Sequence, residues 1–461
     1  MALEGMSVVV VGLARSGVAA AEFLSRRGAS VVATDLKAEG ELPEEALSLR
    51  DLGVRLEAGG HRPSTFAGAS MVVVSPGVPW DLPELETARA AGAEVMAEVE
   101  LAFRHLRGRL AAVTGTKGKS TTTAALGAVL REAGFDARVG GNIGAPLIGL
   151  VEGSTEATVF AVEVSSFQLE GTTRFHPQVA VWLNLSPDHL DRHPTLETYV
   201  AAKARVFARQ EEADWAVVNA DDPVVLEQAR RARARLLPLR VTGEPLPEGD
   251  GAFFRDGDAW MRRDGREERL FARTDVRVPG LHLAGDLLAA AAAARLLGAR
   301  VDDVTRGVAA FGGVEHVIEH VETIDGVAWY NDSKATNVAA AVRSLEAFEG
   351  RVLVILGGRY KGGDFGLLAP RLRARAGRVL AIGEARERVV AALADEVPVD
   401  SCDSLRAAVE RARALAGPGD TVLLAPACSS FDMYTDYAER GRTFKSEVRR
   451  VAEEGERRGD V

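Results

Sequence analysis

The sequence predicts an α/β protein of two or three domains, each with a mainly parallel sheet. Apolar strand-like runs alternate with helical stretches along the whole chain, which is typical of such layered folds. At 461 residues the chain is also longer than a single hydrophobic core usually supports. We place domain boundaries near residues 97 and 313, which divides the chain into 1–97, 98–313 and 314–461.

Strands and helices are expected in alternation within each domain. The strands expected in the first domain are 7–12, 30–35 and 70–77. Those expected later are 157–166, 178–186, 351–358, 378–384 and 421–430, with short antiparallel strands inside 240–275. Helices are expected at 17–28, 85–106 and 198–208 and from about Asp286 onward, with a strand–turn–helix unit at 110–134. In such folds the carboxyl ends of the strands form the edge where ligands bind.

The composition argues against two classes of protein. A formal net charge of −10 disfavours a protein that grips nucleic-acid backbone, and no stretch approaches the roughly 20 apolar residues of a membrane helix. The N-terminus lacks the basic flank of a signal peptide and is interpreted as the first strand. Cys402 and Cys428 give no disulfide framework and suit a reducing compartment. We therefore expect a cytoplasmic monomer that neither enters membranes nor binds nucleic acid.

The strongest motif is GTKGKST, at Gly115–Thr121, between an apolar strand and a helix. There the exposed backbone N–H groups and the helix dipole can hold phosphate. Gly118 permits a tight turn, Lys119 can reach the terminal phosphates, and Ser120 can ligate magnesium. The standard spacing would require glycine where Val113 stands, so the match is to a shorter form. The motif predicts a nucleotide site.

Two side chains lie at the ends of the next apolar strands, at the edge where ligands bind. Glu163 ends one strand, where its carboxylate could hold Mg²⁺, and His189 follows another. Asp188, Asp191 and His193 lie close to His189 in the sequence and leave a metal-dependent hydrolase open as an alternative. Their spacing matches no standard zinc motif, so the residues alone do not decide between the two interpretations.

A second glycine-rich turn, Gly12–Gly17, follows the first strand, and Asp35 ends the next one. This arrangement resembles the dinucleotide fingerprint of NAD-dependent oxidoreductases, which are therefore an alternative class. Ala14 stands where that fingerprint has its second glycine, which hinders close approach of a pyrophosphate to the backbone.

Eight motifs in order resemble the Mur ligase family of bacterial cell-wall synthesis. They are GTKGKST, GGNIG (140–144), EVSSFQLE (163–170), SPDHLDRH (186–193), YVAAKARVF (199–207), NDSKATN (331–337), GGRYKGGDF (357–365) and PACSSFD (426–432). The resemblance spans nearly the whole chain. It implies a Rossmann-like UDP-binding domain, a central P-loop ATPase domain with a mainly parallel sheet, and a Rossmann-like domain for an incoming amino acid.

The resemblance also implies the activity. It is greatest to the members that add D-glutamate to UDP-N-acetylmuramoyl-L-alanine in peptidoglycan precursor synthesis. Such an ATP-dependent ligase uses Mg²⁺, forms an acyl phosphate and releases ADP and phosphate. A non-catalytic sensor of UDP-sugars remains an alternative from another class.

The resemblance assigns binding residues to four ligands. Those implied for ATP are Gly115, Thr116, Lys117, Gly118, Lys119, Ser120, Thr121 and Asp332. Those implied for the UDP group are Arg15, Ser16, Asp35, Leu36, Lys37, Ser75 and Gly77. Those implied for the muropeptide are Asn142, Ser165, Gln168 and His189. Those implied for D-glutamate are Lys334, Thr336, Lys361, Ser430, Phe431 and Tyr437.

The resemblance implies catalytic and metal-binding roles as well. The implied catalytic residues are Lys119, Glu163, His189 and Lys203, and the implied metal ligands are Ser120, Glu163, His189 and a carbamate on Lys203. The carbamate, formed with carbon dioxide, would supply anionic oxygens that a lysine amine lacks. From the residues alone, Lys203 is only a cation on an amphipathic helix.

Three positions depart from the family pattern. Lys117 stands where asparagine is usual, and Val317 replaces an arginine expected near the nucleotide. Leu283 replaces an asparagine expected near the ATP base, and Asp286 follows where a second asparagine is usual. We expect these departures to alter details of ATP binding, with Lys117 compensating in part for the missing arginine charge.

Overall fold

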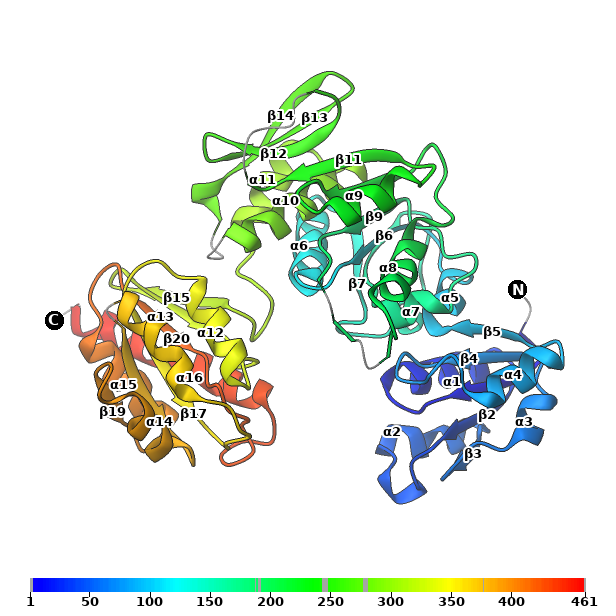
Figure 1. Ribbon diagram of the computed structural model, residues 1–461, viewed down its shortest axis with the longest axis horizontal. Coiled ribbons are helices and arrows are strands. Elements are labelled where there is room, and N and C mark those ends of the chain that lie inside the picture. Colours follow the sequence, from blue (N-terminus) through cyan, green and yellow to red (C-terminus); the bar gives the residue numbers. More distant parts are fainter. Residues whose placement is uncertain are drawn as a thin grey trace. The chain divides into compact units, whose positions relative to one another are not determined.

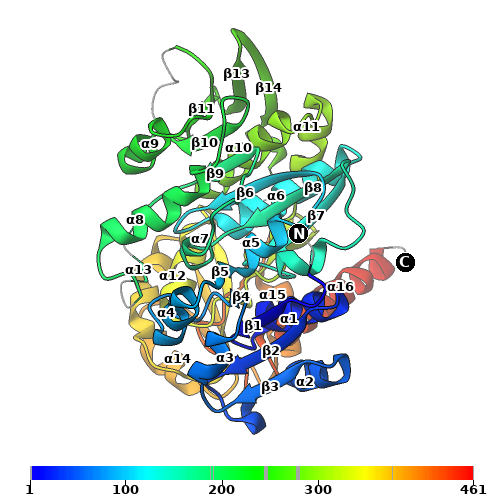
Figure 2. The same cartoon turned by 90° about the vertical axis from the view of Figure 1, so that its right-hand side faces the viewer.

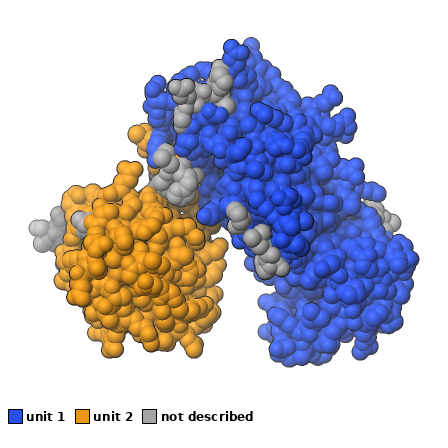
Figure 3. All heavy atoms as spheres, in the orientation of Figure 1, with its two compact units in different colours: residues 1–273, 285–309 blue, residues 274–284, 310–461 orange. Residues whose placement is uncertain are grey.

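The computed structural model describes residues 3–186, 188–189, 192–242, 248–276, 281–375 and 377–459, without the side chains of 281–282 and 455–459. These residues form three sheets joined by helices (Figure 1). The chain divides into two compact units, residues 1–273 with 285–309 and residues 274–284 with 310–461 (Figure 3). The described residues contain no helix long and apolar enough to span a membrane.

The first sheet is a doubly wound, five-stranded parallel sheet in the order β3-β2-β1-β4-β5. Its strands are β1 Ser7–Val11, β2 Ser30–Asp35, β3 Arg55–Ala58, β4 Met71–Val74 and β5 Glu94–Ala97. Its helices are α1 Arg15–Arg26, α2 Glu44–Leu47, α3 Pro63–Ala67 and α4 Pro83–Ala90. Helix α1 covers one face of this sheet, and α3 and α4 cover the other (Figure 2). Val8 and Val10 pack into the α1 side of the core and Val9 and Val11 into the α3–α4 side. The expected strands at 7–12, 30–35 and 70–77 are confirmed.

One sequence prediction in this region is wrong. The stretch 85–106 is not one helix, because α4 ends at Ala90 and β5 and α5 (Glu98–Phe103) follow. Gly92, with φ +87°, ends the helix, and β5 then pairs with β4 while Met96 is fully buried. The pairing of β5 with β4 therefore outweighs the helix propensity of residues 94–97.

The central sheet has nine strands in the order β14-β13-β12-β11-β10-β9-β6-β8-β7. The parallel strands are β6 Arg109–Thr114, β7 Asp136–Gly141, β8 Thr158–Glu163, β9 Val179–Trp182, β10 Trp215–Asn219 and β11 Arg235–Arg240. The strands β12 Gly251–Arg255, β13 Asp258–Arg263 and β14 Arg266–Ala272 complete it, β13 pairing antiparallel with both neighbours as expected. Its helices are α6 Lys119–Glu132, α7 Ser166–Glu170, α8 Leu196–Ala204, α9 Pro223–Arg230, α10 Leu281–Leu296 and α11 Val301–Ala310. The helix expected from about Asp286 therefore begins earlier.

The third sheet, in the second unit, has the order β15-β16-β20-β17-β18-β19. Its strands are β15 Glu319–Ile324, β16 Val327–Asn331, β17 Val352–Gly357, β18 Arg378–Ile382, β19 Val399–Ser401 and β20 Thr421–Leu424. Its helices are α12 Val338–Glu346, α13 Ala369–Ala374, α14 Arg386–Leu393, α15 Leu405–Leu415 and α16 Tyr437–Gly459. The antiparallel β15–β16 hairpin was not predicted, although Asp325 and Gly326 both have positive φ, as a two-residue hairpin turn requires.

A carboxyl group is buried where the first sheet leads into the central one. Glu98, the first residue of α5, is 1% exposed, and its Oε1 accepts a hydrogen bond of 2.7 Å from the backbone N–H of Ile148. Its Oε2 has no hydrogen-bond partner among the described residues. Burial raises the pKa of Glu98 to about 7, against the lowering effect of the Ile148 N–H. The charged form is therefore costly in the folded protein.

We expect Glu98→Gln to remove a pH dependence of stability. Between its ordinary pKa and about 7 the folded state binds more protons at Glu98 than the unfolded state, so stability falls as pH rises through that window. Above pH 7 the charge costs about 3 kcal/mol. Thermal unfolding should show the variant more stable than the wild type near pH 8 and equal near pH 4.5. Parallel pH profiles would contradict this.

Candidate active site

The phosphate loop follows β6 and leads directly into α6. Gly118 caps α6 in the left-handed region at φ +81°, and Lys119 and Ser120 form the helix's first turn. The Lys119 amine donates to the backbone carbonyl of Thr116 at 2.9 Å. Burial lowers the pKa of Lys119, while the carboxylates of Glu163 and Asp188 oppose that shift. The cation therefore lies against its own loop, as a phosphate-binding lysine requires.

Glu163 connects this loop to the neighbouring strand. It ends β8, is 2% exposed, and accepts a hydrogen bond of 2.7 Å from the Ser120 hydroxyl through Oε2. Its Oε1 accepts another of 2.7 Å from the Asn142 side-chain amide. The hydroxyl and the carboxylate are hard oxygen donors on adjacent strand ends, the kind that Mg²⁺ prefers. These two predicted metal ligands are in direct contact.

Lys203 lies beneath the same loop. It is on α8, is 1% exposed, and donates to the backbone carbonyl of Gly115 at 2.8 Å. Its amine lies 4.7 Å from the centroid of the Tyr199 ring. Burial, together with the nearby charge of Lys119, lowers the pKa of Lys203 to about 7, so much of the amine is neutral near neutral pH.

Asn184, which the sequence reasoning missed, fixes the other side of the loop. Its Oδ1 accepts hydrogen bonds from the backbone N–H groups of Thr116 at 3.1 Å and Lys117 at 2.9 Å. Its side-chain amide donates to the Lys117 carbonyl at 3.1 Å. In the sequence Asn184 is only an amide directly after an apolar strand, and the pairing of that strand with β6 gives it this role. The Lys117 side chain itself is exposed.

Asp286 presses against the turn of the phosphate loop. It lies on α10 and is 7% exposed. A Cβ added at Gly118 would be 2.2 Å from its Oδ1. Burial raises the pKa of the Asp286 carboxyl well above its usual value. Position 118 therefore needs glycine for two reasons, a positive φ and lack of space.

Gly118→Ala should impair ATP use beyond the effect of backbone strain. Gly134 is a matched control, since its φ of +82° is nearly the same and nothing lies within 4 Å of its added Cβ. We expect Gly134→Ala to cost about 1 to 2 kcal/mol of stability and to leave the KM for ATP unchanged. Gly118→Ala should raise that KM at least about tenfold, because the loop must shift away from Asp286. Equal kinetics for both variants would contradict this.

His189 lies in the loop after β9, with its ring against Phe167. Its side chain is exposed, its backbone has φ +53°, and its ring lies 4.9 Å from that of Phe167. Within the described ranges no hydrogen bond or ion pair joins it to Ser120, Glu163 or Lys203. Among the described residues, the direct contact between predicted metal ligands is the one between Ser120 and Glu163.

The hydrolase alternative gains no support from the geometry. His193 is buried, with Nε2 2.9 Å from the Ser166 hydroxyl and its ring stacked on Phe167. Asp191 lies outside the described residues. Among the residues that are described, no three His, Cys, Asp or Glu side chains gather as a metal site would require.

A large cavity of about 850 Å³ runs along the carboxyl edge of the first sheet. All seven residues predicted for UDP line it: Arg15, Ser16, Asp35, Leu36, Lys37, Ser75 and Gly77. Two of the predicted muropeptide residues, Asn142 and Gln168, line its other end. Gln168 is 1% exposed, and its Nε2 lacks a hydrogen-bond partner within the described part of the chain. An unsatisfied buried amide of this kind calls for a ligand acceptor.

Another predicted muropeptide residue, Ser165, caps α7. Its hydroxyl accepts from the backbone N–H of Gln168 at 3.2 Å, and Gln168 Oε1 accepts from the Ser165 N–H at 3.0 Å. This capping box fixes the direction of the Gln168 amide. Ser165 therefore positions Gln168.

The carboxylate of Asp35 connects the glycine-rich turn to the end of β2 through two backbone hydrogen bonds. It accepts hydrogen bonds from the backbone N–H groups of Leu13 at 2.6 Å and Lys37 at 2.9 Å. A dinucleotide fold needs this carboxylate for the ribose of NAD. Each oxygen of Asp35 accepts one of these bonds and can accept another, so the activity test decides the oxidoreductase alternative.

The predicted D-glutamate residues lie at the carboxyl edge of the third sheet. The loops after β16, β17 and β20 carry them, and these strands are neighbours in the order β16-β20-β17. Backbone hydrogen bonds join the loops, from Ala427 to Ala335 at 2.9 Å and from Arg359 to Ser429 at 2.9 Å. The residues on these loops are Lys334, Thr336, Lys361, Ser430 and Phe431.

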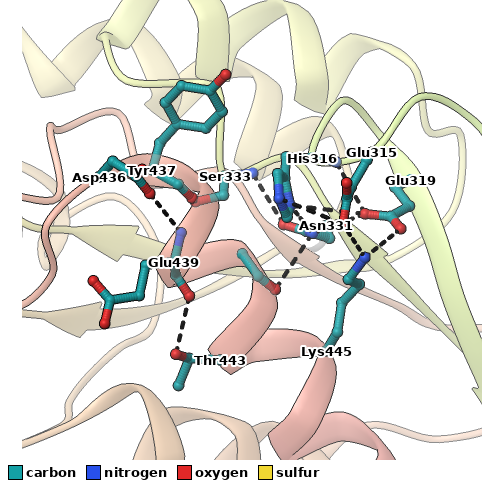
Figure 4. Close-up of polar contacts among 11 residues, drawn as sticks. Glu315, His316, Glu319, Asn331, Ser333, Asp436, Tyr437, Glu439, Thr443 and Lys445 are labelled. Atoms are coloured by element: carbon teal, nitrogen blue, oxygen red, sulfur yellow. Dashed lines mark hydrogen bonds and ion pairs between the residues drawn. The ribbon is translucent and has the colours of Figure 1, made fainter. Parts of the chain in front are cut away.

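Two contacts describe how the predicted D-glutamate residues are held. The Lys361 amine lies 5.4 Å from the centroid of the Phe431 ring, which is 56% exposed. Tyr437 begins α16, and its carbonyl accepts from the Ser333 hydroxyl (Figure 4). Asp332, predicted to contact ATP, is buried, accepts from the Ser344 hydroxyl, and has a pKa raised by burial to about 6.

The segment before β15, where the family pattern is lost, is held by hydrogen bonds (Figure 4). His316 is buried with φ +64°, and its Nδ1 lies 2.8 Å from the Asn331 amide. Lys445 donates to Glu315 at 2.8 Å and to Glu319 at 2.9 Å. Val317, which stands where the family pattern has an arginine, therefore lies between two glutamates that both pair with Lys445.

Three family models match successive parts of the chain. They are "Mur ligase MurD-like, N-terminal domain" at residues 6–97, "Mur ligase middle domain" at 113–294, and "Mur ligase, glutamate ligase domain" at 318–428.

Relatives named UDP-N-acetylmuramoylalanine--D-glutamate ligase match almost the full length. The one from Geotalea uraniireducens is 45% identical over 449 residues, which is 97% of this chain and 98% of its own. The one from Acidobacterium capsulatum is 45% identical over 453 residues, 97% of each chain.

Solved structures share the fold at low identity. The UDP-N-acetylmuramate-alanine ligase of Thermotoga maritima gives a TM-score of 0.55 at 18% identity, covering 97% of this chain and 100% of that one. The MurF ligase of the same organism, solved with ADP, gives 0.54 at 18% identity, covering 97% and 96%. The predicted α/β class is confirmed. With relatives of 45% identity along nearly the whole sequence, the chain belongs to the Mur ligase family.

Proposed function

We propose that this chain is an ATP-dependent ligase that adds D-glutamate to UDP-N-acetylmuramoyl-L-alanine in peptidoglycan precursor synthesis. One observation supports this most strongly: Asn142 lines the cavity of the first sheet and donates to Glu163, which accepts from Ser120 of the phosphate loop. The proposed nucleotide-sugar site and the proposed ATP site are thus joined through two hydrogen bonds. The names of the 45%-identical relatives supply the reaction.

The three domains take one ligand each in this proposal. Residues 1–97 hold the UDP group, 98–313 hold ATP, and 314–461 hold D-glutamate. The N-terminus of α1, at Arg15 and Ser16, directs backbone N–H groups toward the diphosphate. The lactyl-alanine arm of the ligand extends past Gln168 and Asn142 toward Glu163.

In the first half-reaction the L-alanyl carboxylate attacks the terminal phosphorus of ATP, and ADP leaves. Loop N–H groups and the Lys119 ammonium neutralise charge on the transferring group. Ser120 and Glu163 would hold Mg²⁺, which supplies further neutralisation of phosphate charge when bound. Because the leaving group is already activated, the residues contribute mainly position and electrostatic complementarity.

Lys203 completes the ATP site as a carbamate. Its neutral amine adds to the carbon of carbon dioxide and releases one proton, which leaves an anionic N-carboxylate. The pKa of about 7, caused by burial, makes the neutral amine available at physiological pH. A carbamate on Lys203 would supply anionic oxygens under the phosphate loop, where they could help to hold a cation bound with the phosphates.

In the second half-reaction the D-glutamate amine attacks the acyl phosphate. A tetrahedral intermediate forms, phosphate leaves, and the amide bond remains. Lys334 and Lys361 provide cations, and Thr336 and Ser430 provide hydroxyl donors, for the two carboxylates. Phe431 and Tyr437 border the same loops.

Phosphate release tests the proposal. Purified protein with magnesium, bicarbonate and ATP should release phosphate only when UDP-N-acetylmuramoyl-L-alanine and D-glutamate are both present. L-glutamate and other amino acids serve as controls. A sensor would bind without releasing phosphate, and an oxidoreductase would require a nicotinamide absorbance change; either result would overturn the proposal.

A further inference from the structure

One histidine in the cavity of the first sheet has no part in the proposed reaction. His61 lies in the loop between β3 and α3 and lines that cavity. Its ring is fixed on two sides, by the Thr34 hydroxyl 2.9 Å from Nδ1 and by an edge-on contact with Phe66 at 6.0 Å between ring centroids. Thr34 is fully buried. The ring orientation is therefore set before any ligand binds.

The hydrogen bonds around Thr34 determine which ring nitrogen of His61 carries the proton. The Thr34 hydroxyl has one hydrogen and lies 3.2 Å from the carbonyl of Gly60, which can only accept. If the hydroxyl donates to Gly60, it must accept from His61. Both contacts are satisfied only when His61 Nδ1 carries its proton, because the single hydrogen of the Thr34 hydroxyl cannot serve both acceptors.

The other ring nitrogen is then an unprotonated acceptor. Nε2 makes no hydrogen bond to any residue in the part of the chain that the structure describes. Burial lowers the pKa of His61, while the carboxylates of Glu84 on α4 and Asp35 at the end of β2 oppose the shift. The neutral ring therefore predominates at pH 7 and above.

The strand order places His61 at one end of the cavity. The lining residues follow β3, β2, β1 and β4 in turn: His61, then Asp35, then Gly12, then Ser75, with Gln168 of α7 beyond. The N-terminus of α1, suited to a diphosphate, follows β1 in the middle. A nucleotide-sugar whose peptide end reaches Gln168 therefore has its nucleoside at the His61 end.

We propose that His61 selects the nucleoside of the substrate, with Nε2 accepting a hydrogen bond from a neutral N–H or O–H of the uridine. The assignment rests on the proposed function for the placement of the ligand. Two donors have the required chemistry, the N3–H of uracil and a ribose hydroxyl. The alternative is a protonated His61 ring that binds the diphosphate. In that case affinity would rise as pH falls, whereas a neutral acceptor makes affinity fall.

Direct binding of UDP-N-acetylmuramoyl-L-alanine, measured by calorimetry, tests the proposal without turnover. The pyrophosphate of this ligand is esterified at both ends and keeps its charge between about pH 5 and 8. The pH dependence of its affinity should therefore come mainly from His61. Affinity should fall toward acid pH, because protonation of Nε2 removes the acceptor, and the fall should lie below the ordinary histidine range because burial lowers the pKa of His61. An affinity that rises toward acid pH would overturn the proposal.

Two substitutions separate this role from a structural one. His61→Leu removes the acceptor and should weaken binding roughly five- to hundredfold at pH 8, because the ligand N–H or O–H loses its partner. His61→Gln retains an acceptor and should bind within about threefold of the wild type, with no acid dependence. Equal affinity of His61→Leu and wild type would overturn the proposal.

The choice of nucleotide identifies the donor. If uracil N3–H is the partner, the wild type should prefer UDP to CDP, which has no N3–H, and His61→Leu should lose that preference. If a ribose hydroxyl is the partner, 2′-deoxy-UDP should bind more weakly while CDP matches UDP. Wild type that binds as expected yet forms no ADP would refute the proposed function and leave this assignment standing.

Discussion

Replacing Lys119 by methionine will lower the rate of ADP formation by about a thousandfold or more. Methionine keeps the length of the side chain but removes its charge, and Lys119 is the cation in the first turn of α6, beside Gly118. Its amine already lies within the loop, 2.9 Å from the Thr116 carbonyl, so a small movement brings it to a phosphate. Steady-state ADP release at saturating substrates measures the effect.

Arg131→Gln is the matched control for this variant. Arg131 lies in the last turn of the same helix and is exposed, so its loss removes one cation without touching the loop. We expect its rate to stay within about twofold of wild type. Lys445 would be a poor control, because it is paired with both Glu315 and Glu319. A Lys119→Met rate within tenfold of wild type would refute the assignment of the phosphate loop.

The features that the sequence predicted are local ones. The phosphate loop is a short run in which glycine, lysine and serine each have a fixed place, so Gly115–Thr121 could be assigned from spacing alone. The valines of β1 alternate between two buried faces, and their run of apolar residues marks a central strand. Such signals need no knowledge of distant residues.

The features that the sequence did not predict depend on pairing between distant segments. β5 forms because β4 offers it an edge, and nothing in residues 94–97 alone reveals that partner. Asn184 becomes part of the phosphate loop only when β9 lies beside β6. The proton position on His61 depends on Thr34 and Gly60, residues of two different segments. Folding creates these relations, and no spacing rule encodes them.

The second large prediction concerns Lys203. Burial of its amine lowers the stability of the fold, and the proposed chemistry requires the neutral amine that this burial produces. Burial lowers the pKa of its amine to about 7, so between pH 7 and its ordinary pKa the unfolded state binds more protons than the folded state. Stability should therefore rise with pH through that window. At pH 7 the buried amine costs on the order of 4 kcal/mol.

Lys203→Met should accordingly stabilise the protein and abolish its turnover. In bicarbonate-free buffer near pH 7 we expect a gain of about 2 kcal/mol, after subtracting about 1 to 2 kcal/mol for the hydrogen bond lost by the Gly115 carbonyl. ADP formation should fall at least about a hundredfold, and added bicarbonate should stimulate only the wild type. Thermal unfolding and coupled kinetics provide the two readouts.

Lys203→Arg separates the two effects. Arginine keeps a buried cation but cannot form a carbamate, so this variant should be inactive without being stabilised. If Lys203 had only a structural role, methionine would destabilise the protein and arginine would retain activity. We expect instead that the methionine variant is stabilised and inactive and that the arginine variant is inactive without being stabilised. That result would mean that position 203 is a lysine because burial makes its amine neutral. The stability lost at this position is then the consequence of placing a reactive nitrogen under the phosphate loop.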